Sequence, residues 1–385
     1  MKRRILKIVK RKDSNLFFFC IIGYNTNRVL IMNWIVNGHN ILEITLITFV
    51  VSLILVPLAK KIAHHVGAID IPNERKVHKN PMPRMGGLAI YGAFLVGYII
   101  YGEITTQMIS ILIGSFIMVI LGMLDDIKPI SARYKFLVQI IAALIVVIYG
   151  QMYFREISLL GFTIKFNLFF SYFFSVFFIV AISNAINLID GLDGLAGGIS
   201  SIYFLTISII AILLGKTTGL DFILSLVMFG STLGFLYHNF PPAKIFMGDS
   251  GSLFLGFMIS VIALVGYKVA TVTSLIIPII ILAIPIIDTA LAIFRRLLKG
   301  ENIGAPDKEH FHHQLLKLNF SKKVSIILIY LINFMFSAVS IFYVMGNTME
   351  AIILYLLLMV SLLFLILKTD ILYIHNKGKK KKEKK

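Results

Sequence analysis

Residues Asn187–Gly194 read Asn-Leu-Ile-Asp-Gly-Leu-Asp-Gly and interrupt an otherwise almost unbroken apolar part of the chain. We call this stretch the octet. Residues 168–186 before it and 195–214 after it are mostly apolar, so its two carboxylates lie where one expected membrane-spanning segment ends and the next begins. Charged groups close to hydrocarbon are unfavourable and usually functional. A tight turn also uses Asp, Asn and Gly. A turn needs only one or two of them, however, and the octet has five in eight positions, which favours a functional site.

The composition is that of a polytopic membrane protein. Of the 385 residues, 58% are hydrophobic and 15% are charged, and the mean hydropathy is +0.89. Soluble domains are about 45–50% apolar and about 25% charged. The single cysteine, Cys20, excludes an internal disulfide and a cysteine-based zinc site.

The apolar segments predict an all-α fold with about eleven transmembrane helices. A helix that spans a bilayer needs about 20 apolar residues. Several of the segments are shorter and are expected to extend into the interface or to thin the bilayer locally. The eleven segments are 41–58, 86–102, 107–124, 134–150, 167–189, 194–214, 220–239, 250–266, 270–293, 323–345 and 349–367.

The distribution of basic residues predicts the orientation. If the loop after the first segment is cytoplasmic, cytoplasmic loops and the tail hold 25 Lys and Arg residues, and external loops hold only four. Such a bias marks the cytoplasmic side, so the N-terminus is expected outside and the C-terminus inside. The net charge of +18 then reflects this bias and attraction to anionic lipids rather than nucleic acid.

Three parts are expected in the chain: a basic N-terminal extension (1–40), the transmembrane domain (41–367) and a Lys-rich cytoplasmic tail (368–385). The extension holds eight basic residues, which conflicts with an external position. We interpret residues 1–31 as a start-site artefact, with the working protein beginning at Met32; the alternatives are an interfacial basic helix or an extra crossing. Mass spectrometry of the native N-terminus distinguishes them.

The polar clusters all fall on the side predicted to be cytoplasmic, whereas the external loops are short and contain few charged residues. This asymmetry predicts an enzyme at the cytoplasmic membrane surface. A transporter would place charges near the bilayer midplane, and a channel would show a pore-lining pattern. The clusters are residues 70–87, Asp125-Asp126, the octet, 239–252 and 288–313.

Four motifs carry a resemblance to a known family. They are Asp125-Asp126, the octet, residues 242–251 (Pro-Ala-Lys-Ile-Phe-Met-Gly-Asp-Ser-Gly) and residues 310–313 (His-Phe-His-His). In this order they resemble the polyprenyl-phosphate N-acetylhexosamine-1-phosphate transferase family, over residues 41 to about 345. Residues 75–78 (Arg-Lys-Val-His), followed by Pro81, Pro83, Arg84, Gly86 and Gly87, are similar to the branch that uses UDP-N-acetylglucosamine. The muramoyl-pentapeptide branch would have a different sequence here and a run of three histidines.

The resemblance implies transfer of N-acetylglucosamine 1-phosphate from UDP-N-acetylglucosamine to undecaprenyl phosphate, with UMP as the second product. It also implies Mg²⁺ as cofactor, with Mn²⁺ as a substitute, and a multi-pass protein of the cell membrane. The expected pathway is wall teichoic acid or another surface polysaccharide. The alternatives are a muramoyl-pentapeptide transferase, a transporter of an anionic substrate and a non-catalytic scaffold. The expected partners are both substrates and the bilayer, without nucleic acid; a homodimer is left open.

The reaction joins two anions, so a divalent cation and basic side chains must reduce their repulsion. The oxygen donors that Mg²⁺ prefers are numerous: Asp125, Asp126, Asn187, Asp190, Asp193 and Asp249. By resemblance, Asn187, Asp190 and Asp249 are expected to hold the metal and diphosphate, and Asp193 the nucleotide. On a continuous helix, positions 187, 190 and 193 would share a sector of about 120°.

The resemblance assigns catalysis to Asp125, Asp126, Asp190 and Asp249, with one of the first two at the lipid phosphate. A general base is not required, because the second pKa of a phosphate is about 6. Whether Asp249 first forms a phosphoenzyme stays open.

The expected substrate-binding residues are Arg75, His78, Lys135, Asp193, Asn239, His310, His312 and His313. Lys135 could instead be a membrane anchor. The three histidines cannot easily converge on one zinc ion. We expect at least one of them to donate to a phosphate or sugar oxygen; the alternative is a solvated loop.

Overall fold

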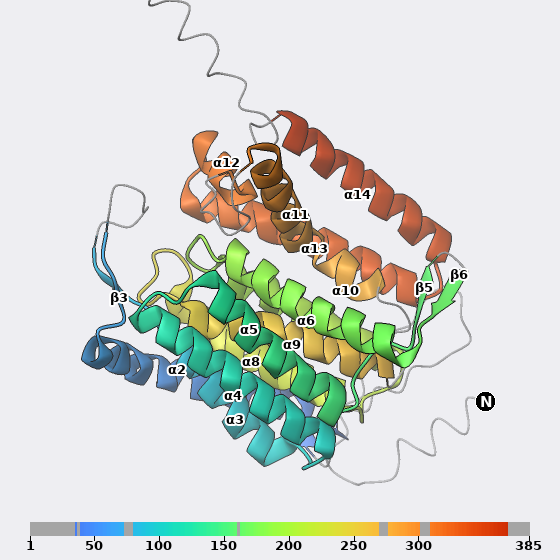
Figure 1. Cartoon of the computed structure of the whole chain (residues 1–385), viewed down its shortest axis with the longest axis horizontal. Helices are drawn as coiled ribbons and strands as arrows, with labels where there is room; N and C mark the ends of the chain where they lie inside the picture. Colours follow the sequence, from blue (N-terminus) through green and yellow to red (C-terminus); the bar gives the residue numbers. More distant parts are fainter. Residues whose placement is uncertain are drawn as a thin grey trace, which may run out of the picture.

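The computed structural model describes residues 35–36, 39–72, 80–159, 162–268, 276–300 and 309–368. Their fold is almost entirely helical, which confirms the predicted class (Figure 1). The helices are α2 (Ile41–Val66), α3 (Gly87–Tyr101), α4 (Thr106–Ile127), α5 (Ala132–Leu144) with its π-helical continuation η1 (Ile145–Tyr149), α6 (Leu168–Ile189), α7 (Leu195–Leu213), α8 (Leu220–Asn239), α9 (Asp249–Lys268), α10 (Ile276–Ile281), α11 (Ala283–Leu298), α12 (Phe311–Lys317), α13 (Lys322–Val344) and α14 (Thr348–Lys368).

The described part contains nine helices that are long and apolar enough to cross a membrane. They confirm a polytopic membrane protein. Two predicted spans differ from these nine: α3 has only 15 residues, and the segment predicted at 270–293 is interrupted at Leu282, between α10 and α11. The eleven crossings and their orientation therefore stay predictions.

The first predicted span forms only part of a longer helix. It was placed at 41–58, but α2 continues through Pro57 to Val66. Gly67 ends the helix in the left-handed conformation (φ 76°), and its N–H bonds to the carbonyl of Ala63, as is common for a glycine after a helix. The last turns of α2, which contain Lys60, Lys61, His64 and His65, therefore separate β3 from the apolar part of the helix.

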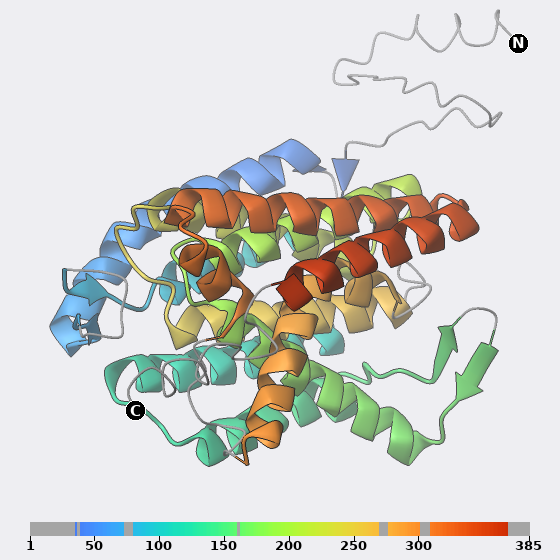
Figure 2. The ribbon, with the colours of Figure 1, turned by 90° about the horizontal axis from the view of Figure 1, so that it is seen from above.

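Helix α9 lies at the centre of the bundle. Its span is 94% buried, against 28% for α2 and 17% for α14. It packs against α3, α4 and α6, with α13 and α14 on one side of the bundle and α2 and α3 on the other (Figures 1 and 2). The close approach needs glycine, because a Cβ at Gly122 of α4 would lie 2.3 Å from the Ser250 nitrogen. The start of α9 is therefore held by its neighbours.

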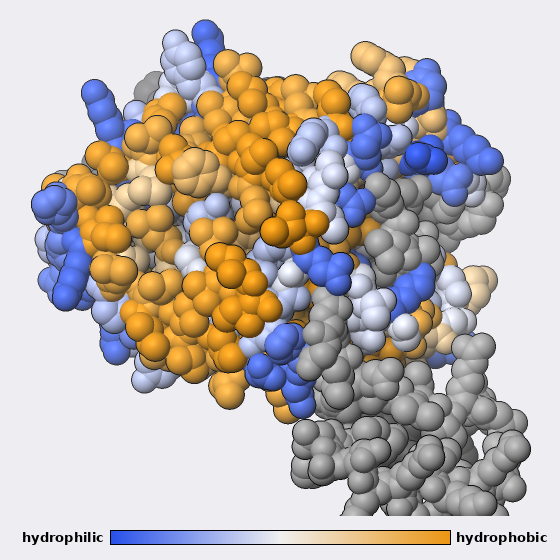
Figure 3. Space-filling view, turned by 90° about the horizontal axis from the view of Figure 1, so that it is seen from below, coloured by the Kyte–Doolittle hydropathy of each residue, from blue (hydrophilic) through white to orange (hydrophobic). Residues whose placement is uncertain are grey.

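The face of the molecule seen in Figure 3 is largely apolar. Large apolar side chains are also exposed on helices around the bundle, for example Leu46 of α2, Phe177 of α6 and Leu356 of α14. In a membrane protein, lipid covers such surface, so these residues need no protein partner.

Three short hairpins complete the described structure: β1 (Ile35–Val36) with β2 (His39–Asn40), β3 (Ile69–Asp70) with β4 (Met82–Pro83), and β5 (Glu156–Leu159) with β6 (Phe162–Lys165). The hairpin of β3 and β4 helps to position the candidate site. Arg84, directly after β4, pairs as an isolated bridge with Phe246, so the chain before α3 is bonded to the chain before α9.

Several predictions fall outside the described residues. These are the start at Met32, most of the extension 1–40 and all but the first residue of the tail 368–385. The predicted substrate-binding residues Arg75 and His78 also lie outside them. The division into three parts stays a prediction.

Candidate active site

A cavity of about 330 Å³ opens at the end of the bundle where α6 ends and α9 begins. It combines carboxylates, two carboxamides, two cationic side chains and a histidine from segments far apart in the sequence. Its lining consists of Asp70, Arg84, Asn187, Asp190, Gly191, Leu192, Asp193, Asn239, Phe246, Met247, Gly248, Asp249, Ser252, His313 and Lys322.

The octet is a turn and not a continued helix, so the geometric argument that placed positions 187, 190 and 193 on one helical face is wrong. Helix α6 ends at Ile189, Asp190 occupies the C-cap position, and α7 begins after Gly194 in the left-handed conformation (φ 81°). The three polar side chains line the same cavity nevertheless.

Asn239 fixes this turn. Its side-chain oxygen accepts a hydrogen bond from the Gly194 N–H (2.8 Å), and its amide nitrogen donates to the carbonyl of Ile245 (2.9 Å). The Tyr330 hydroxyl donates to the carbonyl of Gly194. Asn239 was predicted to contact the nucleotide. It does line the cavity, and its hydrogen bonds also tie the octet to the chain leading into α9.

Asp249, the first residue of α9, lies between two different environments. On one side the Lys135 ammonium is 2.7 Å from Asp249 Oδ2 and also 2.7 Å from Asp125 Oδ2. Asp125 Oδ1 accepts a hydrogen bond from the Ile130 N–H (2.7 Å). Lys135 therefore bridges two carboxylates, and its contact with a substrate stays a prediction.

Asp126 caps the beginning of α9. Its side chain is fully buried and accepts hydrogen bonds from the Asp249 N–H (2.9 Å), the Ser250 N–H (3.1 Å) and the Ser250 hydroxyl (2.8 Å). Carboxylates stabilise the free N–H groups of a helix N-terminus. Asp125, Asp126 and Lys135, which we call the closed side, do not line the cavity; Lys135 and Asp126 bond directly to Asp249.

The opposite side of Asp249, formed by Asn187, Asp190 and Asp193, we call the open side. The Asp190 carboxylate makes no hydrogen bond or ion pair with any residue that the structure describes. Burial and the nearby charge of Asp249 raise the pKa of Asp190, to about 8. Asn187 donates to the Ser252 hydroxyl (2.9 Å), and Asp193 Oδ2 lies 3.4 Å from the Ala243 N–H and 4.0 Å from Lys322 Nζ.

The open side fits a divalent cation. Asn187, Asp190 and Asp249 supply oxygen donors to one cavity, and a bound cation would compensate the Asp190 carboxylate, whose pKa is otherwise raised by burial. Within the described ranges no three His, Cys, Asp or Glu side chains converge as a ready ligand set. Mg²⁺ does not need one, because it usually binds through one or two carboxylates with phosphate and water.

The three histidines have different positions, which the sequence did not distinguish. His313 lines the cavity. His312 is buried against the octet, where a Cβ at Gly191 would lie 2.3 Å from its Nε2. Burial lowers the pKa of both imidazoles, so they are neutral at physiological pH. His310 Nδ1 lies 2.8 Å from Asp288 Oδ2.

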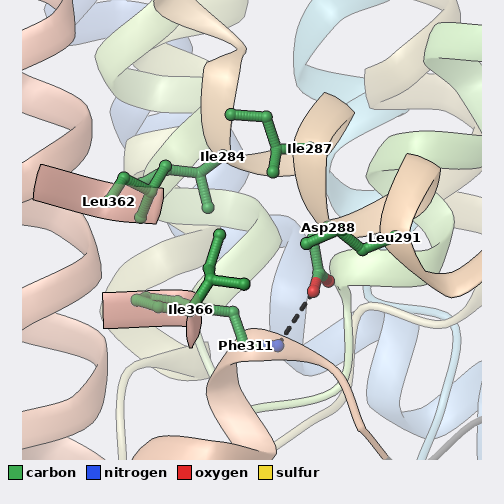
Figure 4. Close-up of a pocket in the computed structure, with 7 residues that line it drawn as sticks. All are labelled: Ile284, Ile287, Asp288, Leu291, Phe311, Leu362 and Ile366. Atoms are coloured by element: carbon green, nitrogen blue, oxygen red, sulfur yellow. Dashed lines mark hydrogen bonds between the residues drawn. The ribbon is translucent and has the colours of Figure 1, made fainter. Parts of the chain in front are cut away.

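Asp288 of α11 holds the start of α12. It accepts a hydrogen bond from the Phe311 N–H (2.8 Å; Figure 4) as well as bonding to His310. The neighbouring pocket is very small and otherwise lined by apolar side chains. Asp288 therefore orients the histidine segment.

Several residues that line the cavity were not among the predicted site residues. Arg84 was recognised only as part of a motif, Lys322 only as a basic residue on the cytoplasmic side, and Asp70 only as a member of a polar cluster. Others, such as Phe246 and Ser252, lie within or beside the motif that leads into α9. Their contributions depend on how β3, β4 and α13 fold back towards the octet.

Comparison with known proteins gives one family. Residues 108–267 match glycosyl transferase family 4. The chain is 49% identical over 299 residues to the probable undecaprenyl-phosphate N-acetylglucosaminyl 1-phosphate transferase of Bacillus subtilis (strain 168), covering 76% of this chain and 82% of that protein.

More distant relatives have similar names. Identity is 34% over 300 residues to the decaprenyl-phosphate N-acetylglucosaminephosphotransferase of Mycolicibacterium smegmatis, covering 70% of this chain and 74% of the relative. It is 30% over 284 residues to the undecaprenyl-phosphate alpha-N-acetylglucosaminyl 1-phosphate transferase of Escherichia coli (strain K12), covering 70% and 75%. The family match at residues 108–267 includes Asp125, Asp126, the octet and almost all of α9.

Proposed function

Because this chain belongs to glycosyl transferase family 4, we propose that it transfers N-acetylglucosamine 1-phosphate from UDP-N-acetylglucosamine to undecaprenyl phosphate. The names of its relatives support this sugar over the muramoyl-pentapeptide donor. The observation that carries the proposal is the cavity itself, where Asn187, Asp190 and Asp249 meet at the end of an apolar bundle. A water-soluble diphosphate and a membrane-bound phosphate can both reach such a place.

The reaction is a displacement at the β-phosphorus of the donor. An oxygen of the lipid phosphate forms a new P–O bond, the bond between the β-phosphorus and the bridging oxygen breaks, and UMP leaves with that oxygen. Both reactants are anionic, so the protein must position them and neutralise charge. Asn187, Asp190 and Asp249 would hold Mg²⁺, which supplies positive charge to the diphosphate when bound.

The contacts of Asp249 favour a direct displacement over a phosphoenzyme. Both of its oxygens face cations, with Lys135 at 2.7 Å and Arg84 at 3.5 Å. A carboxylate held in this way is a weaker nucleophile than a free one, and the phosphate dianion needs no general base at neutral pH.

The orientation forms part of the proposal. The cavity includes Lys322, and α2 carries Lys60 and Lys61 towards the same end as β3. The basic bias supports a cytoplasmic position for this end, where nucleotide sugars are available. The product would then begin teichoic acid or another surface polysaccharide.

The test is a donor comparison. Purified full-length protein in nanodiscs containing undecaprenyl phosphate is given UDP-N-acetylglucosamine, UDP-N-acetylgalactosamine or UDP-N-acetylmuramoyl-pentapeptide, and UMP and lipid product are measured. We expect both products from UDP-N-acetylglucosamine, only with lipid phosphate and Mg²⁺ or Mn²⁺, and none in EDTA. Product from the muramoyl donor alone, or none from any donor, would contradict the proposal.

A further inference from the structure

Arg84 faces the cavity from outside the helical bundle. Its guanidinium lies near carboxylates of three separate elements: Asp126 of α4 (3.4 Å), Asp249 of α9 (3.5 Å) and Asp70 of β3 (3.6 Å). Arg84 lines the cavity and also contacts Asp126 of the closed side and Asp249. A charge in this position can act on whatever anion enters.

The backbone around Arg84 is fixed on two sides. Its N–H donates to the carbonyl of Ala68 (3.0 Å), and the preceding carbonyl of Pro83 accepts from the Phe246 N–H (2.9 Å). The Gly86 N–H donates to the carbonyl of Phe246 (3.0 Å). The base of the side chain is therefore held in register with the segment that leads into Asp249.

The guanidinium itself is held less tightly than the neighbouring ammonium. Lys135 makes two contacts of 2.7 Å, which is the length of a strong charge-assisted hydrogen bond. The three contacts of Arg84 are all 3.4 Å or longer, and its side chain is 30% exposed. Arg84 thus balances the surrounding negative charge without committing its N–H donors to one partner.

We propose that Arg84 binds the diphosphate of the donor, with Asp70 positioning its guanidinium at the edge of the cavity. The inference rests on the proposed function and adds a specific residue to it. The planar fork of an arginine matches two phosphate oxygens, and a diphosphate entering the cavity supplies a closer anionic partner than the carboxylates do. Asp70, on β3, keeps the side chain from folding entirely onto Asp126 and Asp249.

A purely structural role would have a different signature. If Arg84 only tied β4 to α4 and α9, its removal would weaken binding of every nucleoside to the same extent and lower the melting temperature. A phosphate-binding role weakens ligands in proportion to their phosphates and leaves uridine unaffected.

The experiment is calorimetric titration of full-length protein in nanodiscs with uridine, UMP and UDP-N-acetylglucosamine in Mg²⁺. For Arg84→Gln we expect about 10- to 100-fold weaker binding of UDP-N-acetylglucosamine, the size of one lost charged hydrogen bond, a smaller loss for UMP, and unchanged uridine binding. Arg84→Lys should recover part of the loss, since it keeps the charge but not the fork. Asp70→Asn should show a loss of a few-fold with the same dependence on phosphate. Arg155→Gln, an exposed arginine beside β5, is the matched control and should bind all three normally.

Equal losses for all three ligands, or no loss in Arg84→Gln, would overturn the inference. Because the titration needs no lipid acceptor, it is separate from the proposed transfer. Wild-type protein that binds the donor but makes no lipid product would refute the proposed function while leaving Arg84 testable. Wild-type protein that makes product, with Arg84→Gln binding as tightly, would refute the role of Arg84 alone.

Discussion

The closed and open sides of Asp249 contain similar residues but satisfy them differently. On the closed side, each oxygen of Asp125 and Asp126 has a partner within 3.1 Å. On the open side, the Asp190 carboxylate has no partner among the described residues, and the contacts of Asp193 are 3.4 Å and 4.0 Å long. The closed side is complete without a ligand, whereas the open side is not.

This difference separates positioning from binding. A carboxylate with all its hydrogen bonds stabilises the fold, and losing one partner leaves buried donors unpaired. A buried carboxylate without partners destabilises the protein until a cation or donor arrives. We therefore expect substitutions on the closed side to change stability and those on the open side to change ligand binding.

The largest loss of activity is expected for Asp249→Asn, because Asp249 lies between the closed side and the open side. The substitution removes the charge that faces Lys135 and Arg84, and it leaves only a neutral amide oxygen where a carboxylate donor to Mg²⁺ is proposed. The rate of UMP release should fall about 10²–10³-fold, as for other groups that stabilise charge in a transition state. Circular dichroism and size-exclusion chromatography control for folding; near-normal turnover in folded protein would remove Asp249 from the centre.

The glycines test the two sides sterically. A Cβ at Gly248 (φ 73°) would lie 2.3 Å from Asp126 Oδ2, and one at Gly191 would lie 2.3 Å from His312 Nε2. Gly248→Ala should lower both melting temperature and turnover, since a left-handed alanine alone costs about 1–2 kcal/mol. Gly191→Ala should lower turnover about tenfold with a smaller change in melting temperature.

Gly67→Ala is the control for backbone strain, because Gly67 has a similar φ of 76° and no atom of the described residues lies within 4 Å of the added Cβ. If Gly248→Ala melts no lower than Gly67→Ala, the contact with Asp126 has no role in holding α9.

The stability of the metal-free protein should depend on pH through Asp190. Its pKa in the folded protein is raised from 3.8 to about 8, so the folded state retains a proton that the unfolded chain loses. Stability should therefore fall as pH rises from about 4 to about 8. Melting temperatures in EDTA between pH 5 and pH 8 should show this fall, and Asp190→Asn should reduce it. An unchanged pH profile in Asp190→Asn would show that the titration of Asp190 does not cause this fall in stability.

The smallest change in enzyme kinetics is expected for Lys322→Gln. Lys322 lies 4.0 Å from Asp193 Oδ2 and is partly exposed, and exposed ion pairs contribute about 0.2–1 kcal/mol. The KM for the nucleotide sugar should rise only a few-fold, with kcat almost unchanged. Lys323→Gln, the exposed neighbour, should have no effect; a large fall in kcat for Lys322→Gln would place this lysine at the reacting phosphates.

Much of the fold was predictable because the bilayer imposes simple rules. Apolar length located the helical segments, although it could not reveal the break at Leu282 or the continuation of α2 through Pro57. The break at Leu282 and the length of α2 depend on local backbone geometry and on where the polar surroundings begin. The hydropathy of the sequence contains neither kind of information.

The sequence predicted which carboxylates belong to the site. It did not predict which of them are held by other side chains and which are open to a ligand. Asp125 and Asp126 are adjacent in sequence, yet one bonds to Lys135 and the other caps α9. Arg84 and Asp249 are 165 positions apart and meet only because Phe246 pairs with the chain beside β4. Such pairings arise from tertiary structure, so a single sequence cannot show them.

The division between the two sides is tested most directly by comparing Asp126→Asn with Asp190→Asn, measuring the melting temperature and UMP release of each in the same nanodiscs. Asp126→Asn cannot accept the hydrogen bonds of Asp249 and Ser250 with both side-chain atoms, so we predict a clearly lower melting temperature together with lower turnover. Asp190→Asn should lose turnover while its melting temperature in EDTA stays equal to, or rises above, that of the wild type. The reverse pattern, an unstable Asp190→Asn and a stable, inactive Asp126→Asn, would contradict the account.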